Sequence, residues 1–467
     1  MCSIACEAVI SSRVQTSSAA IALLLFAGGA AAPALAQEQL ESGPTAEARP
    51  ITLEQLEEEA LSGNVGVLIA EEQARIAVAD ESRARSFLWP EVGIESGVIR
   101  STDPVFAFGT KLRQARFTES DFELDVLNDP DPIEDWSAQV DVRWRVLSPT
   151  RWMALSAAGE AARSAEWITV RTREMTLFWA RELYFNAIRT AAHRVAAEAT
   201  EKAASATVER FRRRRERGLL TEADQLQAEA DLATARADRV DRQRAEFESR
   251  QELGSFLGWP PDVLPVPIDT LVAPTAIITR PFDAAARPDV RSLEAAWSAT
   301  RAERRRATLA FIPAIDAFGG VASHSEDILD SESTDWSVGV VLRWPAFTGF
   351  RLSAELDRAH GEERIARRLY EQARRDAEVE VDQAIRAVLA AEERVKATEA
   401  ARRAGRRATE LMRRRFEEGL ATPSDLLISE ARLSTTRGHA IDALTAYHVA
   451  VARAEFVQSQ VGSEEDR

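Results

Sequence analysis

Apolar and polar residues alternate strictly along residues 136–146. The apolar positions are Trp136, Ala138, Val140, Val142, Trp144 and Val146. The polar positions between them are Ser137, Gln139, Asp141, Arg143 and Arg145. This period of two predicts a β-strand with one apolar and one polar face. Residues 336–344 repeat the pattern, and shorter alternating segments lie at 91–100 and 314–323. We therefore predict four strands.

The segments between these strands predict unusually long helices. Residues 151–217 contain no proline and almost no glycine. A helix of roughly 65 residues is about 100 Å long at 1.5 Å per residue. The other predicted helices are 52–88, 222–257, 283–310, 351–418 and 423–460. Residues 101–135, which contain three prolines, predict a loop.

Seven-residue rows on two of these helices predict lengthwise packing. One row is Val381, Val388 and Val395, and the other is Leu426, Leu433, Ala440, Tyr447 and Ala454. Small residues in the rows allow the helices to approach closely.

Several segments occur twice in the same order. W-S-A-Q-V-D-V-R-W at Trp136 returns as W-S-V-G-V-V-L-R-W at Trp336, and G-L-L-T-E-A-D at Gly218 returns as G-L-A-T-P-S-D at Gly419. Such recurrence predicts an internally duplicated strand–helix unit. The predicted divisions are a signal peptide (1–36), an N-terminal arm (37–50), a first repeat (51–258), a Pro-rich linker (259–282), a second repeat (283–462) and a C-terminal tail (463–467).

The first 36 residues read as a secretory signal. Residues 19–27 are apolar, and Ala34-Leu35-Ala36 is an A-x-A cleavage site. Both cysteines, Cys2 and Cys6, lie in this leader, so we expect a mature chain without disulfides, thiol metal sites or a lipidated cysteine. No later run of 18 apolar residues occurs, so a membrane-spanning part must consist of strands.

The two-faced strands favour a transmembrane barrel, with lipid outside and water inside. Paired Trp residues eight positions apart, Trp136 with Trp144 and Trp336 with Trp344, predict a membrane-interface belt at both edges of the apolar band. A half-buried sheet in a soluble sandwich is the alternative. The signal peptide and the lack of other strands favour the barrel, and since four strands cannot enclose an aqueous channel, several protomers must share one.

The repeated G-L-x-T-x-x-D motif predicts two tight turns between long helices. Gly218 and Gly419 supply the left-handed residue at a helix end, and Thr221 and Thr422 can cap the next helix. Capping by the threonine does not require Asp224 or Asp425, the last residues of the two motifs, although the helix dipole favours an acid near a helix start.

No catalytic or cofactor site is predicted. Arginine clusters at 212–215, 402–407 and 413–415 are interleaved with acids in a chain of net charge −16, so we interpret them as solvated helix faces rather than nucleic-acid sites. Five scattered histidines lack metal-ligand spacing, and phosphate-loop, dinucleotide and nucleophile-elbow motifs are absent.

The chain resembles the TolC-like outer-membrane efflux proteins over nearly its whole length after the leader. The resemblance rests on A-L-S-G-N-V around Asn64 with A-R-P-D-V around Asp289, on the strand-opening Pro90 and Pro313, on W-P-A-F-T-G-F-R at 344–351 and on R-R-R-F-E-E-G-L-A-T-P-S-D-L-L at 413–427. It implies a mainly α fold with a small transmembrane β part: a homotrimer with a 12-stranded barrel in the outer membrane and an α-helical tunnel in the periplasm. It also implies a passive exit duct that docks a periplasmic adaptor and, through it, an inner-membrane pump or a type I secretion apparatus.

The resemblance also assigns roles to the helix turns. Residues matching the adaptor-docking tip are Gly218, Leu219, Thr221, Gly419, Leu420 and Thr422, and those matching the tunnel constriction are Asp224 and Asp425. Phe416 occupies a position that is often Tyr. Ala421 stands where some members carry an Arg that locks the closed tip, so closure must differ here. A periplasmic coiled-coil adaptor without a barrel and a secreted enzyme are the rival hypotheses; the exported substrate cannot be read from the sequence.

Overall fold

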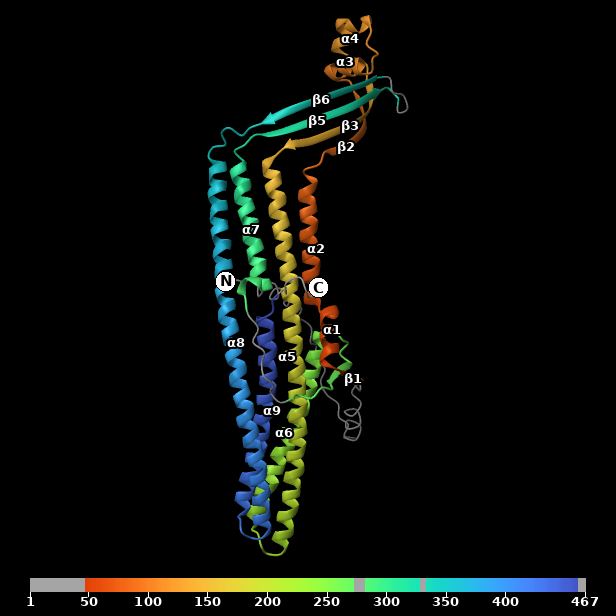
Figure 1. The fold of residues 1–467 in the computed structure, drawn as a ribbon. Helices are drawn as coiled ribbons and strands as arrows, with labels where there is room; N and C mark the ends of the chain where they lie inside the picture. Colours follow the sequence, from red (N-terminus) through yellow and green to blue (C-terminus); the bar gives the residue numbers. More distant parts are fainter. Residues whose placement is uncertain (1–46, 273–281, 328–332, 461–467) are drawn as a thin grey trace, which may run out of the picture. The chain divides into compact units, whose positions relative to one another are not determined.

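The computed structural model describes residues 47–272, 282–327 and 333–460 (Figure 1). The predicted signal peptide, residues 37–46 of the arm and the tail lie outside this range. The strands are β1 (Glu47–Ile51), β2 (Glu91–Ser101), β3 (Ile133–Leu147), β4 (Val263–Pro267), β5 (Ala314–Ser325) and β6 (Ser333–Arg343). The α-helices are α1 (Leu53–Gly63), α2 (Val65–Ser86), α3 (Pro104–Arg113), α4 (Leu124–Asn128), α5 (Pro149–Glu216), α6 (Glu222–Phe256), α7 (Pro288–Leu309), α8 (Arg351–Glu417) and α9 (Pro423–Val457).

The four predicted strands form one antiparallel sheet in the order β2-β3-β5-β6. The central pair, β3 with β5, joins strands from the two halves of the chain. β3 and β6 each begin three residues before the predicted start, at Ile133 and Ser333. In the described residues β2 and β6 each pair on one side only, so both edges of the sheet are open.

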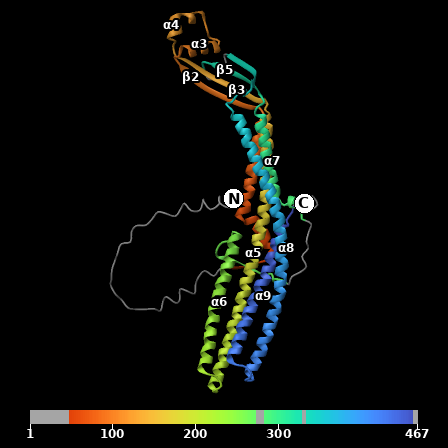
Figure 2. The same ribbon diagram turned by 90° about the vertical axis from the view of Figure 1, so that its left-hand side faces the viewer.

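Two very long helices follow strands of this sheet, α5 after one residue and α8 after a connection of seven residues. α5 has 68 residues and follows β3, while α8 has 67 residues and follows β6. Figures 1 and 2 show α5, α6, α8 and α9 side by side. Val381, Val388, Tyr447 and Ala454 share one buried cluster, so the heptad rows of α8 and α9 pack together as predicted.

The predicted helix at 52–88 is wrong as a single element. It breaks at Asn64, whose side-chain oxygen accepts a hydrogen bond from the Gly66 N–H at 2.9 Å and so caps α2. The same side chain donates to the Phe256 carbonyl at 3.3 Å, which ties the break to the end of α6. No proline marks this break, which is stabilised by the Asn64 cap and by the contact with the end of α6.

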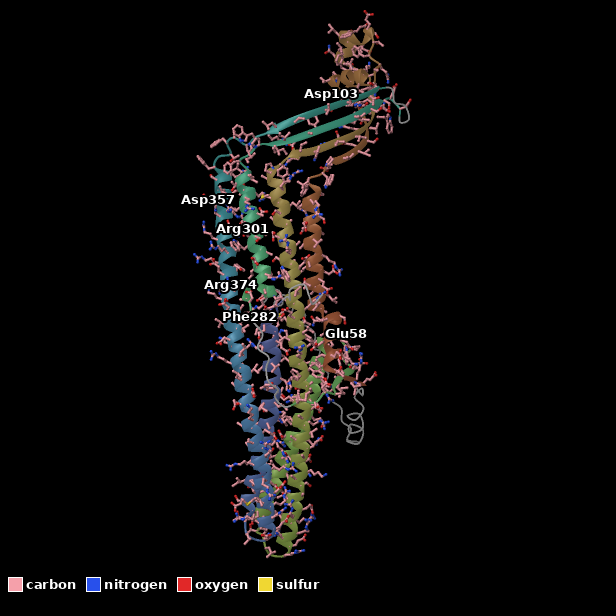
Figure 3. All side chains as sticks on the ribbon, in the orientation of Figure 1. Glu58, Asp103, Phe282, Arg301, Asp357 and Arg374 are labelled. Carbon is pink, nitrogen blue, oxygen red and sulfur yellow. The ribbon has the colours of Figure 1, made fainter. Side chains whose placement is uncertain are left out.

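The predicted loop at 101–135 is also wrong, because it contains α3, a 3-10 helix (Glu119–Phe122) and α4. Asp103, labelled in Figure 3, accepts a hydrogen bond from the Phe106 N–H at 2.7 Å and caps α3, and Pro104 occupies the first helical position. Gln114, which is fully buried, donates to the carbonyls of Glu134 and Ser325. The segment is therefore docked onto the sheet.

Two short strands, β1 and β4, lie where no strand was predicted. β1, at the end of the assigned arm, pairs in parallel with β4, in the assigned linker. Tyr184 of α5 lies beside this pair, where its hydroxyl donates to the Ile51 carbonyl at 3.0 Å and to Asp269 at 2.7 Å.

Within the described residues, no helix is both long enough and apolar enough to cross a membrane.

Candidate functional site

One face of the four-stranded sheet is apolar from edge to edge. In the register, Ile94 of β2 lies opposite Val140, and Val140 lies opposite Val321 of β5. The side chains on this face are exposed, including Ile94 (80%), Trp336 (75%) and Val340 (70%). A contiguous exposed apolar surface of this kind marks a contact with lipid or protein.

The opposite face of the same sheet is polar and charged. Its strand residues include Glu91, Glu95, Gln139, Asp141, Arg143, Arg145, Asp316, Asp335 and Arg343. The sheet thus separates an apolar side from a side suited to water.

The two Trp residues nearest the helices tie strand ends to helix ends. The Trp144 indole N–H donates to the Leu88 carbonyl at 3.0 Å, and the Trp344 indole N–H donates to the Phe311 carbonyl at 3.1 Å. Each acceptor lies two residues before a strand-opening proline. Trp344 itself lies one residue beyond β6.

The two Trp pairs are staggered in the sheet. Trp336 of β6 pairs with Val321 of β5, which in turn pairs with Val140 of β3. Trp336 is therefore displaced from Trp136 by four residues along the strands. Such a stagger suits strands that are tilted, as they must be in a barrel. The spacing of the Trp residues in the sequence does not contain this information.

Both helix turns have the same backbone. Gly218 (φ 73°) and Gly419 (φ 78°) are left-handed, and the following Leu219 and Leu420 N–H groups donate to the carbonyls five residues back, at 2.9 and 2.7 Å. These are Schellman motifs. A Cβ at either glycine would meet nothing within 4 Å, so the backbone conformation, not space, requires glycine.

The threonines and aspartates of the turns form two matching capping boxes. Thr422 donates from its N–H (3.0 Å) and its hydroxyl (2.6 Å) to one Asp425 oxygen, while the Asp425 N–H donates to the hydroxyl at 3.2 Å. Thr221 and Asp224 have the same three bonds at the same distances. The Thr422 hydroxyl, followed by its backbone N–H, lowers the pKa of Asp425. Asp425 is therefore an anion at neutral pH.

The two helix ends beside the turns contact each other through Phe211 and Phe416, a contact that the sequence does not predict. The rings of Phe211 and Phe416 lie 5.2 Å apart in a buried cluster that Ala421 also contacts. The Arg214 guanidinium lies 4.5 Å from the Phe416 ring and donates to the Glu417 carbonyl at 2.6 Å. Ala421 therefore belongs to an apolar contact between the turns.

A groove of about 400 Å³ lies between the starts of α6 and α9. Its lining residues are Ala223, Asp224, Gln227, Asp231, Pro423, Ser424, Leu427, Ile428 and Ala431. Asp224 lines this groove and Asp425 does not. Leu219 and Leu420 are 65% and 64% exposed beside it in the turns. The turns thus combine a groove, two exposed leucines and two carboxylates.

The arginine clusters differ in their surroundings: Arg402 pairs with an acid of its own helix, whereas Arg413 of α8 pairs with a largely buried acid of α9. Arg402 contacts Glu399 at 2.7 Å, and Arg413 contacts Glu430 at 2.9 Å. Over the described ranges, no three His, Cys, Asp or Glu side chains come together as a metal site.

Comparisons with known proteins give a family and a fold. The model of a family described as outer membrane efflux protein matches residues 58–259 and 284–455. No curated protein matches the sequence. The outer membrane protein VceC from Vibrio cholerae has a TM-score of 0.72 at 20% identity, covering 87% of this chain and 96% of VceC.

Two further solved structures are similarly related. A membrane protein from Pseudomonas aeruginosa has a TM-score of 0.76 at 19% identity, and the match covers 87% of this chain and 93% of the Pseudomonas protein. The MtrE outer membrane channel from Neisseria gonorrhoeae, in its open state, has a TM-score of 0.72 at 19% identity, and the match covers 87% of this chain and 88% of MtrE. At these identities the structural similarity shows the fold.

Proposed function

Because this chain belongs to the outer membrane efflux protein family, we propose that three copies form a channel across the outer membrane. The channel is a passive exit duct of a tripartite efflux pump or a type I secretion system. Each copy supplies β2, β3, β5 and β6 to a 12-stranded barrel, and the long helices of the three copies form a tunnel in the periplasm.

The two-faced sheet with open edges is the observation that carries this proposal. Its exposed apolar face fits lipid, and its charged face fits a water-filled lumen. Long unpaired edge strands seek a partner strand, and a second copy offers one. Since neighbouring strands alternate in direction from β2 to β6, β6 of one copy and β2 of the next are antiparallel, as barrel closure requires.

The helix turns are the proposed docking end for a periplasmic adaptor. The groove between α6 and α9, with the exposed Leu219 and Leu420, offers a concave and partly apolar surface. Asp224 and Asp425 are proposed to face the tunnel constriction, and an inner-membrane pump would be reached through the adaptor.

Disulfide trapping between copies tests the barrel. Residues 37–467 contain no cysteine, so introduced cysteines are the sole thiols after removal of the leader. One cysteine at Val92 or Ile94 of β2 is combined with one at Val338 or Val340 of β6, and oxidation should yield dimer and trimer bands. Two such strands pair only between copies, because β3 and β5 separate them within one copy.

The matched control replaces the β2 cysteine by Val140→Cys on β3. β5 lies between β3 and β6, which places their Cα atoms about 10 Å apart, too far for a disulfide. The proposal fails if no β2–β6 pair cross-links in membranes, or if the detergent-extracted protein is a monodisperse monomer.

A further inference from the structure

A cleft of about 780 Å³ lies where the strands of the sheet meet the helices. Four arginines line it: Arg143 and Arg145 of β3, Arg343 of β6, and Arg151 in the first turn of α5. Glu91 and Asp316 are the acids among its lining residues. The cleft therefore has a net charge of 4 − 2 = +2 in a chain whose total is −16.

Asp316 neutralises only part of this charge. Its two carboxylate oxygens lie 2.6 Å from Arg145 Nε and 3.1 Å from Arg343 Nε, so one acid serves two arginines. In the described part of the chain, Arg143 has no ion pair or hydrogen bond from its guanidinium, although Glu91 lies opposite it in the register. One exposed guanidinium is thus open to an incoming anion.

The fourth arginine is close to the others and also lacks an acid partner within the described residues. Arg151 donates to the Phe87 carbonyl and lies 5.4 Å from the Phe87 ring. Burial, followed by the charge of Arg145, lowers the pKa of Arg151. Asp316 and Glu91 act in the opposite direction on this pKa. Arg145 is thus near enough to Arg151 to repel it, and an anion between the two would relieve that repulsion.

The strand arginines project to the polar side of the sheet, as the register shows. Arg143 lies opposite Phe318, and Arg343 lies two positions beyond Val341, which pairs with Asp316. Farther from the helices, the same face carries Glu95, Asp141 and Asp335. The charge on this face thus changes sign along the strands, from basic beside the helices to acidic beyond.

We propose that this arginine cleft binds an anionic group, a carboxylate, sulfonate or phosphate, on solutes that pass through the channel. The inference rests on the proposed function and adds a substrate class to it. In a trimer the three clefts would carry 3 × 2 = +6 around the entrance from the tunnel to the barrel. Guanidinium groups bind such oxyanions through paired hydrogen bonds.

Current block by tripolyphosphate tests the proposal. Purified trimers in a planar bilayer conduct in about 0.1 M KCl, where the Debye length is about 10 Å, and tripolyphosphate in both chambers should reduce the current. In about 1 M KCl, with a Debye length of about 3 Å, the block should weaken. Arg143→Gln with Arg343→Gln should raise the blocking concentration about tenfold or more.

Two control variants keep the test specific. Arg143→Lys retains the charge and should retain most of the block. Arg358→Gln removes an exposed arginine of α8 that pairs with Glu362, and should change nothing. Unchanged block in the double glutamine variant, with normal conductance, overturns the arginine cleft and leaves the channel intact.

A wild-type protein that does not conduct would refute the proposed channel instead. Calorimetric titration of the detergent-solubilised protein with tripolyphosphate then tests anion binding by the cleft without requiring conduction. Heat of binding that disappears with Arg143→Gln and Arg343→Gln supports the site, and no binding heat overturns it.

Discussion

Arginine placed at mid-depth on the apolar face of the sheet should prevent assembly of the channel. Val340 lies four residues from Trp336 and four from Trp344, about 13 Å along a strand. With a strand tilt of about 40°, this places Val340 about 10 Å from either edge of the apolar band. Its side chain is 70% exposed, so an arginine there would face lipid.

The cost follows from this depth. An arginine at the midplane of a barrel costs about 2–4 kcal/mol, even though its long side chain can reach part of the way to the interface. The equilibrium for each copy shifts by about 30-fold to 700-fold. In the proposed barrel of three copies, Val340→Arg should cost a trimer about 6–12 kcal/mol.

The assay compares trimer yield and its resistance to urea for matched variants in outer membranes. Val140→Arg should act like Val340→Arg, and Leu342→Arg, two residues nearer the interface, should cost less. Asp141→Arg, on the polar face, should assemble normally. Equal assembly of all four variants would show that the apolar face does not contact lipid.

Three further predictions concern the turns and the α3–α4 segment. Asp425→Asn should weaken cation preference and block by divalent ions in single-channel currents without loss of trimer. Since the pKa of Asp425 is lowered, the cation preference of the wild type should persist at a pH below about 4, where an ordinary aspartate becomes protonated. Unchanged selectivity would make Asp425 only a helix cap. Gly419→Val forces a β-branched residue to φ 78° at a cost of about 1–3 kcal/mol, so export and co-purification with the adaptor should fall more than with Gly419→Asn, while trimers persist. Lys111, followed by the backbone N–H and the hydroxyl of Thr118, lowers the pKa of Asp121 to about 2. This carboxylate therefore stabilises the segment at neutral pH and loses that effect as the pH falls from about 4 towards 2. Hydrogen exchange in residues 104–128 should rise over that range, and Lys111→Met should move the rise to higher pH.

The strands of the four-stranded sheet and the helix turns can be predicted from the sequence, because they depend on local residue patterns. Strict alternation predicts β3, and the glycine and threonine of each turn predict its backbone, since few residue types favour each of these conformations. The break at Asn64 has a local part, the cap of α2 by Asn64, and a part that the sequence does not show, the bond to the Phe256 carbonyl 192 residues away. α3, by contrast, has a readable signal: Asp103 followed by Pro104 is an N-cap and a first helical residue.

Contacts between distant segments were the least predictable. β1 and β4 are five-residue strands containing prolines, and neither shows an alternation that would identify a strand. The arginine cleft combines Arg143 with Arg343, which are 200 residues apart. Each arginine is visible in the sequence, but only the register of the sheet shows that they share one cleft.

The strand order also has a consequence for how the chain folds. The pair β2–β3 closes a loop of 46 residues between Ile94 and Val140, whereas β3–β5 closes one of 181 residues between Val140 and Val321. For a flexible chain, the longer loop costs about 1.2 kcal/mol more in entropy. Once α5 and α6 have folded back on each other, their hairpin returns the chain towards β3 and reduces that cost. The long helices should therefore fold before the centre of the sheet. The apolar face becomes continuous only afterwards, which limits the time for which it is exposed to water.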